Sequence, residues 1–248
     1  MKSSNPALMS NPFSGFGLVS ESNAMTIRGT VIKTCILLLL VMLPAAWVWR
    51  KFALAGGNPA AVQIWMITGL VGGLVLSLAT IFKKNWAPLT APMYAVLEGL
   101  FLGAISCVFE ASYPGVVAQA VSLSIATLLV MLAVYQAGWI KVTDSFKTGI
   151  VAATGGIALV YLVSIGLSFF GVQVPFIQGS GIFSILFSLF VVGLAALNFV
   201  LDFEFIQQGA RARIPKYMEW YGAFALMVTL IWLYVEILRL LAKLNDRK

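Results

Sequence analysis

From about residue 31 to the end, the chain is a succession of apolar runs, each long enough to cross a lipid bilayer. The hydrocarbon core of a bilayer is about 30 Å thick, and a helix needs about 20 mostly apolar residues to cross it. Seven such runs follow one another, at about Val31–Trp49, Ala60–Phe82, Leu89–Phe109, Val116–Ala137, Thr148–Phe170, Gly181–Phe205 and Trp220–Leu241. This pattern predicts an all-α, polytopic membrane protein with seven transmembrane helices.

Composition supports the same fold class and leaves room for one folded domain. Of the 248 residues, 60% are hydrophobic and 10% are charged, whereas a soluble globular protein has about 25% charged residues. Seven helices and their short loops take up nearly all of residues 31–248, which we interpret as a single transmembrane bundle. Residues 1–30 are rich in Ser, Asn, Gly and Pro, and we expect them to form a disordered polar tail.

The residue types present exclude several classes of function. The chain has no histidine, which removes Ser-His and Cys-His catalysis and histidine-ligated metal sites. Its two cysteines lie inside apolar runs and form no CxxC pair. We therefore expect neither enzymatic activity nor a cofactor. The net charge of +7 comes largely from basic residues in loops and at helix ends, where they meet lipid headgroups, so we expect the bilayer as a partner and no nucleic acid.

The basic residues of the loops also predict the orientation in the membrane. Loops on the side of the N-terminal tail carry seven lysines and arginines, whereas loops on the opposite side carry Arg50 and Lys51. Because short cytoplasmic loops are enriched in Lys and Arg, the N-terminus is predicted to be cytoplasmic. Seven crossings then leave the C-terminus outside, yet the closing segment is basic, with Arg239 and Lys243 among its residues. Either this tail is tolerated outside, or the last segment does not cross fully.

Acidic residues inside the runs are candidate functional residues, because a charge in hydrocarbon is costly. Glu98 lies near the middle of the third run, ~15 Å from the start of that helix. It is either a neutral acid hydrogen-bonded to a neighbouring helix, or a ligand for protons or cations that faces a cavity. Asp202 lies late in the sixth run. It is either an interfacial carboxylate held by Lys or Arg, or a gate whose protonation changes a contact between helices.

Other charged and small residues have simpler interpretations. Glu236 precedes Arg239 by three residues, so the two can form a local ion pair on one helix. Glu204 lies two residues after Asp202, points elsewhere and is expected to be solvated. Lys33, near the start of the first run, is expected to reach the membrane interface with its ammonium group. In the second run, three glycines at positions 69, 72 and 73 offer a close-packing face.

Several segments resemble those of a known family. They are Leu97–Gly103, Val200–Asp202, the Leu- and Arg-rich closing helix, Met25–Thr34 and Lys216–Gly222. Together with the seven runs they resemble the Bax inhibitor-1 family, also called the transmembrane Bax inhibitor motif family, in a bacterial branch. The resemblance extends from about residue 25 to the end. It implies six helices around a central seventh, in a bacterial inner membrane.

For function, the resemblance implies a pH-dependent calcium leak in which aspartates of the sixth and seventh helices share a proton. The sixth-helix aspartate corresponds to Asp202. Its partner corresponds to Glu236 if Tyr234-Val235-Glu236 is matched to the family's Tyr-x-Asp, or to Thr229 if positions are counted back from the closing leucines. Depth favours Thr229, because Glu236 would lie ~24 Å from the face near which Asp202 lies. The two-carboxylate sensor is then incomplete, and Glu98 is a substitute partner for Asp202.

We therefore expect an integral membrane protein that resembles a pH-sensitive calcium or cation leak channel. Its pH-sensing site or ion pathway would comprise Asp202, Glu98, Thr229 and Glu236. Calcium prefers several oxygen ligands, so we expect no strong metal site and only a weak calcium contact at Asp202. The alternative is a regulatory membrane protein without transport that binds a membrane protease or another membrane partner, for which the glycine-rich second run would be suited.

Overall fold

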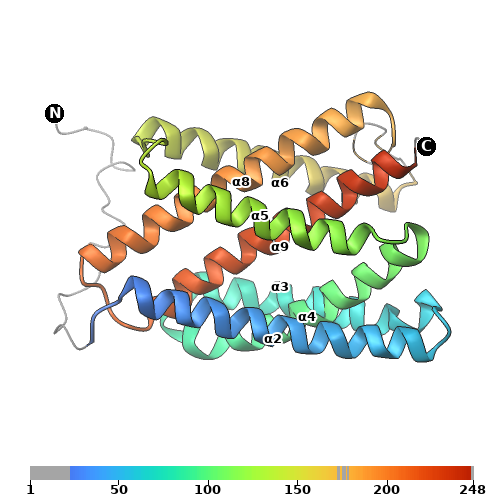
Figure 1. Ribbon diagram of the computed structural model, residues 1–248, viewed down its shortest axis with the longest axis horizontal. Coiled ribbons are helices and arrows are strands. Elements are labelled where there is room, and N and C mark those ends of the chain that lie inside the picture. Colours follow the sequence, from blue (N-terminus) through green and yellow to red (C-terminus); the bar gives the residue numbers. More distant parts are fainter. Residues whose placement is uncertain (1–22, 172–173, 175–176, 178, 247–248) are drawn as a thin grey trace.

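The structure is a computed structural model that describes residues 23–171, 174, 177 and 179–246. Within these residues the chain forms seven long helices and two short 3₁₀ helices (Figure 1). In chain order they are α2 (Ile27–Leu54), η2 (Pro59–Val62), α3 (Gln63–Phe82), η3 (Lys84–Trp86), α4 (Ala87–Ser112), α5 (Val116–Gln136), α6 (Asp144–Phe169), α8 (Ile182–Arg211) and α9 (Met218–Asn245). The disordered tail was expected over residues 1–30. Residues 1–22 lie outside the described residues, whereas residues 23–30 are placed, with Met25 buried and α2 beginning at Ile27.

In the described part of the chain, seven helical segments are long and apolar enough to cross a membrane, which confirms the predicted fold class. Several helices extend beyond the apolar runs into polar sequence. Thus α2 begins at Ile27, and α8 continues past Phe205 to Arg211. The added turn of α8 contains Gln207 and Gln208, and glutamine is a good helix former. As a result, Asp202 lies well before the end of its helix, deeper in the bundle than its position late in the apolar run suggested.

Local sequence signals set where some helices begin. Thr26 is the N-cap of α2, and its hydroxyl oxygen accepts a hydrogen bond of 2.9 Å from the Gly29 amide. Thr143 caps α6 in the same way, accepting a 3.2 Å bond from the Phe146 amide. Each bond satisfies one of the amides that a helix start leaves without an internal partner. Gly115 precedes α5 with a φ of +86°, a conformation that residues with a Cβ rarely adopt.

The last helix, α9, is the centre of the bundle (Figure 1). It packs against α2, α4, α5 and α8. Within its apolar segment 50% of the residues are buried, against 17% in α2, α3, α5 and α6. The largest core cluster joins it to α8 through side chains such as Leu233 and Tyr234 of α9 and Phe199 and Phe203 of α8. This arrangement agrees with the expected set of helices around a central seventh.

Glycines bring the backbones of α2, α3 and α4 into direct contact. A Cβ added at Gly69 of α3 would lie 2.5 Å from the carbonyl oxygen of Leu97 in α4. One added at Gly99 of α4 would lie 2.4 Å from the carbonyl oxygen of Val41 in α2. Small residues at such crossings allow membrane helices to pack closely. The glycine-rich face predicted in the second run is therefore occupied by α4 of the same chain.

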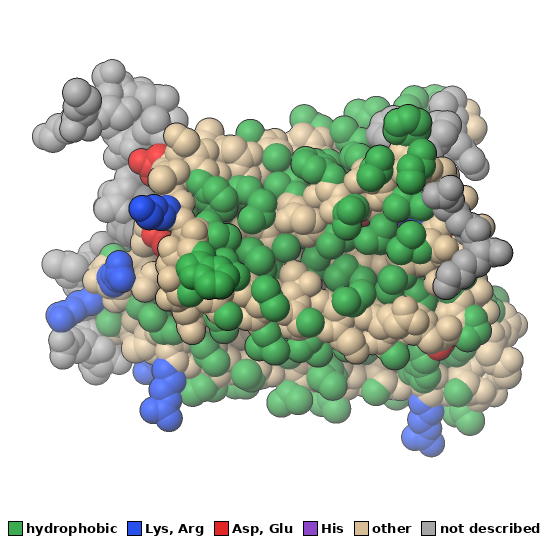
Figure 2. Space-filling model, turned by 45° about the horizontal axis from the view of Figure 1, so that its top comes forward, with side chains coloured by type: hydrophobic (Ala, Val, Ile, Leu, Met, Phe, Trp, Pro, Cys, Tyr) green, Lys and Arg blue, Asp and Glu red, His purple; other side chains and the backbone are tan. Residues whose placement is uncertain are grey.

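The two ends of the bundle differ in charge. The start of α2 and the α8–α9 turn lie at one end of Figure 1, here called the N-terminal end of the bundle, and the end of α9 lies at the other. On the face shown in Figure 2, most visible Lys and Arg side chains gather at the N-terminal end. The final helix is continuous over 28 residues, ~42 Å at 1.5 Å per residue. It is therefore long enough to cross the hydrocarbon core completely.

Candidate functional site

A cavity of about 370 Å³ lies between α3, α4, α8 and α9. Its lining includes Glu98 of α4, Asp202 of α8, Thr229 of α9 and Ser77 of α3, among apolar and aromatic side chains. Three of the four residues expected in the site, Glu98, Asp202 and Thr229, thus share one cavity. The fourth, Glu236, does not line it.

Asp202 and Thr229 are in direct contact. The Thr229 hydroxyl donates a hydrogen bond of 2.6 Å to Asp202 Oδ2, which joins α8 to the central helix. Counted from the N-terminal end of the bundle, Asp202 lies ~14 Å deep along α8 and Thr229 ~17 Å deep along α9. Threonine carries no charge and offers one donor. The pair is therefore a single carboxyl with a hydroxyl partner, not two carboxyls that share a proton.

Glu98 reaches the same cavity from α4, ~17 Å along that helix from the same end. Its carboxyl group lies against the backbone of Gly73 in α3, where an added Cβ would be 2.7 Å from Oε1. Tyr94, one turn earlier on α4, is within hydrogen-bonding reach of Glu98. Both Glu98 and Asp202 are half-buried, whereas Glu236 is only 1% exposed. This difference in exposure fits their positions, since Glu98 and Asp202 face a cavity and Glu236 is enclosed by neighbouring side chains.

Glu236 belongs to a second polar cluster, nearer the opposite end of the bundle. Its carboxylate accepts hydrogen bonds of 3.0 Å from Arg239 Nη1 and from the Tyr161 hydroxyl of α6. It lies ~27 Å along α9 from the N-terminal end, so it is not brought to Asp202. The local ion pair with Arg239 is present.

The donor set of the cavity does not form a tight metal site. Among the described residues, no group of three or more Cys, Asp or Glu side chains is placed to hold a metal ion. Calcium takes six to eight oxygen ligands, and two carboxyls with a few hydroxyls supply less than such a shell.

Comparison with known proteins assigns the chain to a family. The family model described as Bax inhibitor 1 like matches residues 5–246. The chain belongs to the Bax inhibitor-1 family. The match spans nearly the whole chain and confirms the predicted resemblance. No curated protein and no solved structure matches the chain.

In this Bax inhibitor-1 family protein, part of the basic closing segment is used inside the bundle. Lys243 is 7% exposed, and its Nζ donates a 2.7 Å hydrogen bond to Ser188 Oγ of α8. Arg239 pairs with Glu236 one turn earlier. Sequence reasoning counted both cations as part of a basic tail. Their bonds account for two of the four cations of that tail, and the other two, Arg247 and Lys248, lie outside the described residues.

The aromatic wall of the cavity was not singled out from the sequence. It comprises Tyr94 of α4 with Tyr221 and Phe224 of α9. Tyr94 could have been found, because it precedes Glu98 by four residues and so shares its helix face. Phe224 carried no such signal, since one aromatic residue in an apolar helix is ordinary core sequence.

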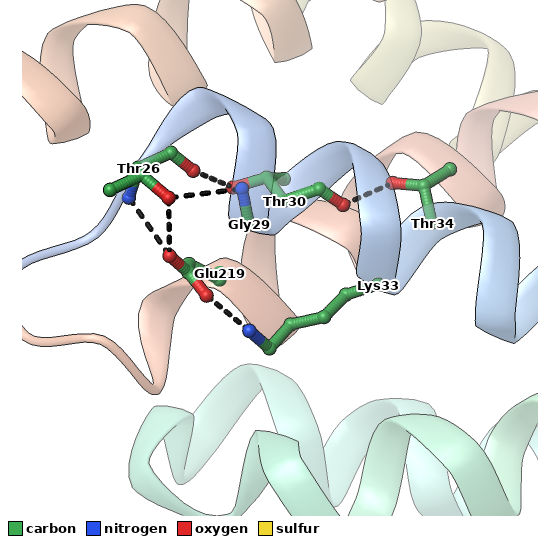
Figure 3. Close-up of polar contacts among 6 residues, drawn as sticks. All are labelled: Thr26, Gly29, Thr30, Lys33, Thr34 and Glu219. Atoms are coloured by element: carbon green, nitrogen blue, oxygen red, sulfur yellow. Dashed lines mark hydrogen bonds and ion pairs between the residues drawn. The ribbon is translucent and has the colours of Figure 1, made fainter.

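A buried ion pair joins the beginnings of α2 and α9 in this member of the Bax inhibitor-1 family (Figure 3). Glu219 is 1% exposed, and its carboxylate pairs with Lys33. The same carboxylate accepts hydrogen bonds from the Thr26 amide at 3.0 Å and hydroxyl at 2.8 Å. The sequence did not indicate this partner: the ammonium group of Lys33, expected to reach the membrane interface, pairs with an acid far along the chain at the N-terminal end of the bundle.

Glu204 points away from the cavity, as expected, and is partly exposed. Its carboxylate is not simply solvated but accepts hydrogen bonds from the Tyr135 hydroxyl at 2.8 Å and from Gln208 Nε2 at 2.6 Å. These bonds tie α8 to α5. Glu204 therefore lies close to Asp202 in sequence but does not line the cavity.

Proposed function

We propose that this protein is a pH-sensitive leak channel for calcium or other cations. The observation that carries the proposal is the cavity in which Glu98, Asp202 and Thr229 meet at about the middle of the bundle. Ionisable groups at that depth in a membrane are costly and typically mark ion or proton pathways. Membership in the Bax inhibitor-1 family supports the same interpretation.

The pH response in this proposal comes from the two carboxyls of the cavity. When charged, they attract cations into a region that is otherwise apolar. When protonated, they do not, and the Asp202 carboxyl can then donate as well as accept hydrogen bonds, which changes its contact with Thr229. Cation flux should therefore fall as the pH falls.

The proposed location is a bacterial inner membrane, with the N-terminus in the cytoplasm. The support is the gathering of Lys and Arg at the N-terminal end of the bundle, together with the positive-inside rule. The proposal includes no enzymatic activity and no cofactor. In this proposal, calcium binds Asp202 only weakly and transiently.

The second candidate is a regulatory protein that binds a membrane protease or another membrane partner without transport. Its sequence support was the glycine face of α3. Because α4 occupies that face within the chain, a partner cannot use it without displacing α4. The structure thus gives this candidate less support than the leak channel.

The test is calcium flux into liposomes that contain the purified protein and an entrapped calcium dye. We expect flux above that of empty liposomes, which decreases between pH 8 and pH 5. Asp202→Asn and Glu98→Gln should each lower the flux at pH 8 at least threefold and flatten its pH dependence. Glu204→Gln is the matched control, because this acid lies on α8 outside the cavity. Flux equal to that of empty liposomes would rule the leak channel out.

A further inference from the structure

One wall of the cavity is a continuous set of aromatic rings. The Tyr94 and Phe224 rings are 4.9 Å apart between centroids and meet edge to face at 74°. The Tyr221 and Phe224 rings follow at 6.2 Å. A path for hydrated metal ions has no need of such a wall. Aromatic faces instead attract organic cations, whose charge is carried on an apolar body.

The rim of the cavity faces sideways, between α3 and α9. On α3 its lining includes Leu70, Leu74 and Ile81, which are 53%, 59% and 47% exposed on the outer surface. On α9 it includes Val228, which is 37% exposed. These side chains line the cavity and also face outward. The cavity therefore opens on the apolar flank of the bundle. A ligand can therefore reach the cavity from the hydrocarbon layer.

The charge of the cavity selects the sign of such a ligand. Its charged lining residues are Glu98 and Asp202, both acidic. A cation does lie near its aromatic wall: Nζ of Lys84, in η3, is 5.4 Å from the Tyr221 ring centroid. Lys84 is at the N-terminal end of the bundle, and the two carboxyls are about two to three helical turns deeper. The deep part of the cavity is thus acidic, and the opening between α3 and α9 is apolar.

We propose that this cavity binds a lipophilic organic ammonium ion that enters from the membrane. Its nitrogen would lie near Glu98 and Asp202, and its apolar body against Tyr94, Phe224 and Tyr221. A volume of about 370 Å³ falls within the usual range of small-molecule sites, roughly 300–1,000 Å³. The proposal rests on the same assignment of the site as the proposed function, and an occupant of this kind would block cation flow.

Other occupants fit the cavity less well. A lipid acyl chain would fill the apolar flank but leave the two carboxyls without a ligand. A hydrated metal ion would use the carboxyls but gain nothing from three aromatic rings and an opening toward lipid. An ammonium ion with an alkyl body uses the acidic, aromatic and apolar parts of the lining at once.

The test measures binding of hexyltrimethylammonium to the full-length protein in lipid nanodiscs by titration calorimetry, with empty nanodiscs as the blank. We expect saturable binding to the wild-type protein. Glu98→Gln and Asp202→Asn should each raise Kd at least tenfold, and Tyr221→Leu at least threefold. Glu204→Gln should leave Kd unchanged. The neutral analogue of the same shape, 2,2-dimethyloctane, should not compete.

Each outcome separates this proposal from the leak channel. Equal Kd values for the wild type, Asp202→Asn and Tyr221→Leu would overturn the ligand site, as would competition by the neutral analogue. Tyr221→Leu keeps both carboxyls, so it still tests the site if an acid variant fails to fold. Calcium flux without ammonium binding would overturn this inference alone. Saturable binding with no flux in the wild type would support the ligand site and overturn the proposed function.

Discussion

Lys33 and Glu219 connect the first and the last transmembrane helices across 186 residues of sequence. Glu219 is the more deeply buried partner, with 1% of its side chain exposed against 16% for Lys33. The Lys33 ammonium also lies 5.5 Å from the centroid of the Trp220 ring. Because α9 is the central helix, this pair fixes the outer helix α2 to the core of the bundle near the N-terminal end.

Loss of this pair should destabilise the protein. Lys33→Met leaves the buried Glu219 carboxylate without its cation, and breaking a buried ion pair from one side costs about 3–5 kcal/mol. The double variant Lys33→Met/Glu219→Gln leaves no unpaired charge and should cost less than Lys33→Met alone. The measurement is the free energy of unfolding by SDS in mixed micelles.

The matched control is Arg28→Met, because Arg28 is an exposed cation on the same helix. It should change the free energy of unfolding by less than about 0.5 kcal/mol. A Lys33→Met variant as stable as Arg28→Met would show that the ion pair contributes nothing to stability.

A second carboxyl beside Asp202 should change the pH dependence of flux. Thr229→Asp replaces the hydroxyl donor with an acid. Two adjacent carboxylates disfavour the doubly charged form, so they retain one proton to a higher pH than a single carboxyl does. The pair should therefore ionise in two steps, and the upper step of the flux profile should lie about one unit or more above the wild-type midpoint.

Thr229→Asn is the control for this change, since it has a similar size and adds no charge. Its half-maximal pH should stay closer to that of the wild type than that of Thr229→Asp. Coincident pH profiles of Thr229→Asp and Thr229→Asn in the liposome assay would contradict a sensing role for this position.

Close packing between α3 and α4 predicts a cost for adding even one methyl group. The Cβ of Gly69→Ala would lie 2.5 Å from a backbone oxygen of α4, which cannot move aside as a flexible side chain could. Overpacking of this kind costs typically about 1–3 kcal/mol. Gly166→Ala on α6 is the control, because nothing lies within 4 Å of its added Cβ. SDS unfolding should show a loss of stability for Gly69→Ala and none for Gly166→Ala.

Helix spans and approximate depth could be predicted from the sequence, but long-range partners could not. Seven apolar runs fixed the fold class because membrane thickness sets helix length. Depth along the helices favoured Thr229 over Glu236 as the neighbour of Asp202, and the hydrogen bond lies there. The partner of Lys33 was missed because no local spacing relates it to Glu219. The end of α8 was missed because a helix continues into polar sequence whenever its residues are good helix formers.

The structure also predicts the side of the C-terminus. The last helix is continuous from Met218 to Asn245 and ~42 Å long, longer than the hydrocarbon core of about 30 Å. Two of the cations that made the closing segment look cytoplasmic have partners on the bundle: Lys243 is buried and bonded to Ser188, and the more exposed Arg239 pairs with Glu236. Cations used in this way do not act as free loop charges. With a cytoplasmic N-terminus, the C-terminus should therefore lie outside.

Reporter fusions in a bacterial host measure this side directly. Alkaline phosphatase fused after Lys248 is active only outside the cytoplasm and should be active, whereas green fluorescent protein at the same position should remain dark. Truncated fusions that end in the α8–α9 turn are the matched control and should give the opposite pattern, because that turn lies at the N-terminal end of the bundle. Fluorescence of the full-length fusion together with an inactive phosphatase would mean that α9 does not cross the membrane, or that the whole bundle is inverted. The truncated fusion distinguishes these two outcomes, since an inverted bundle would make its phosphatase active.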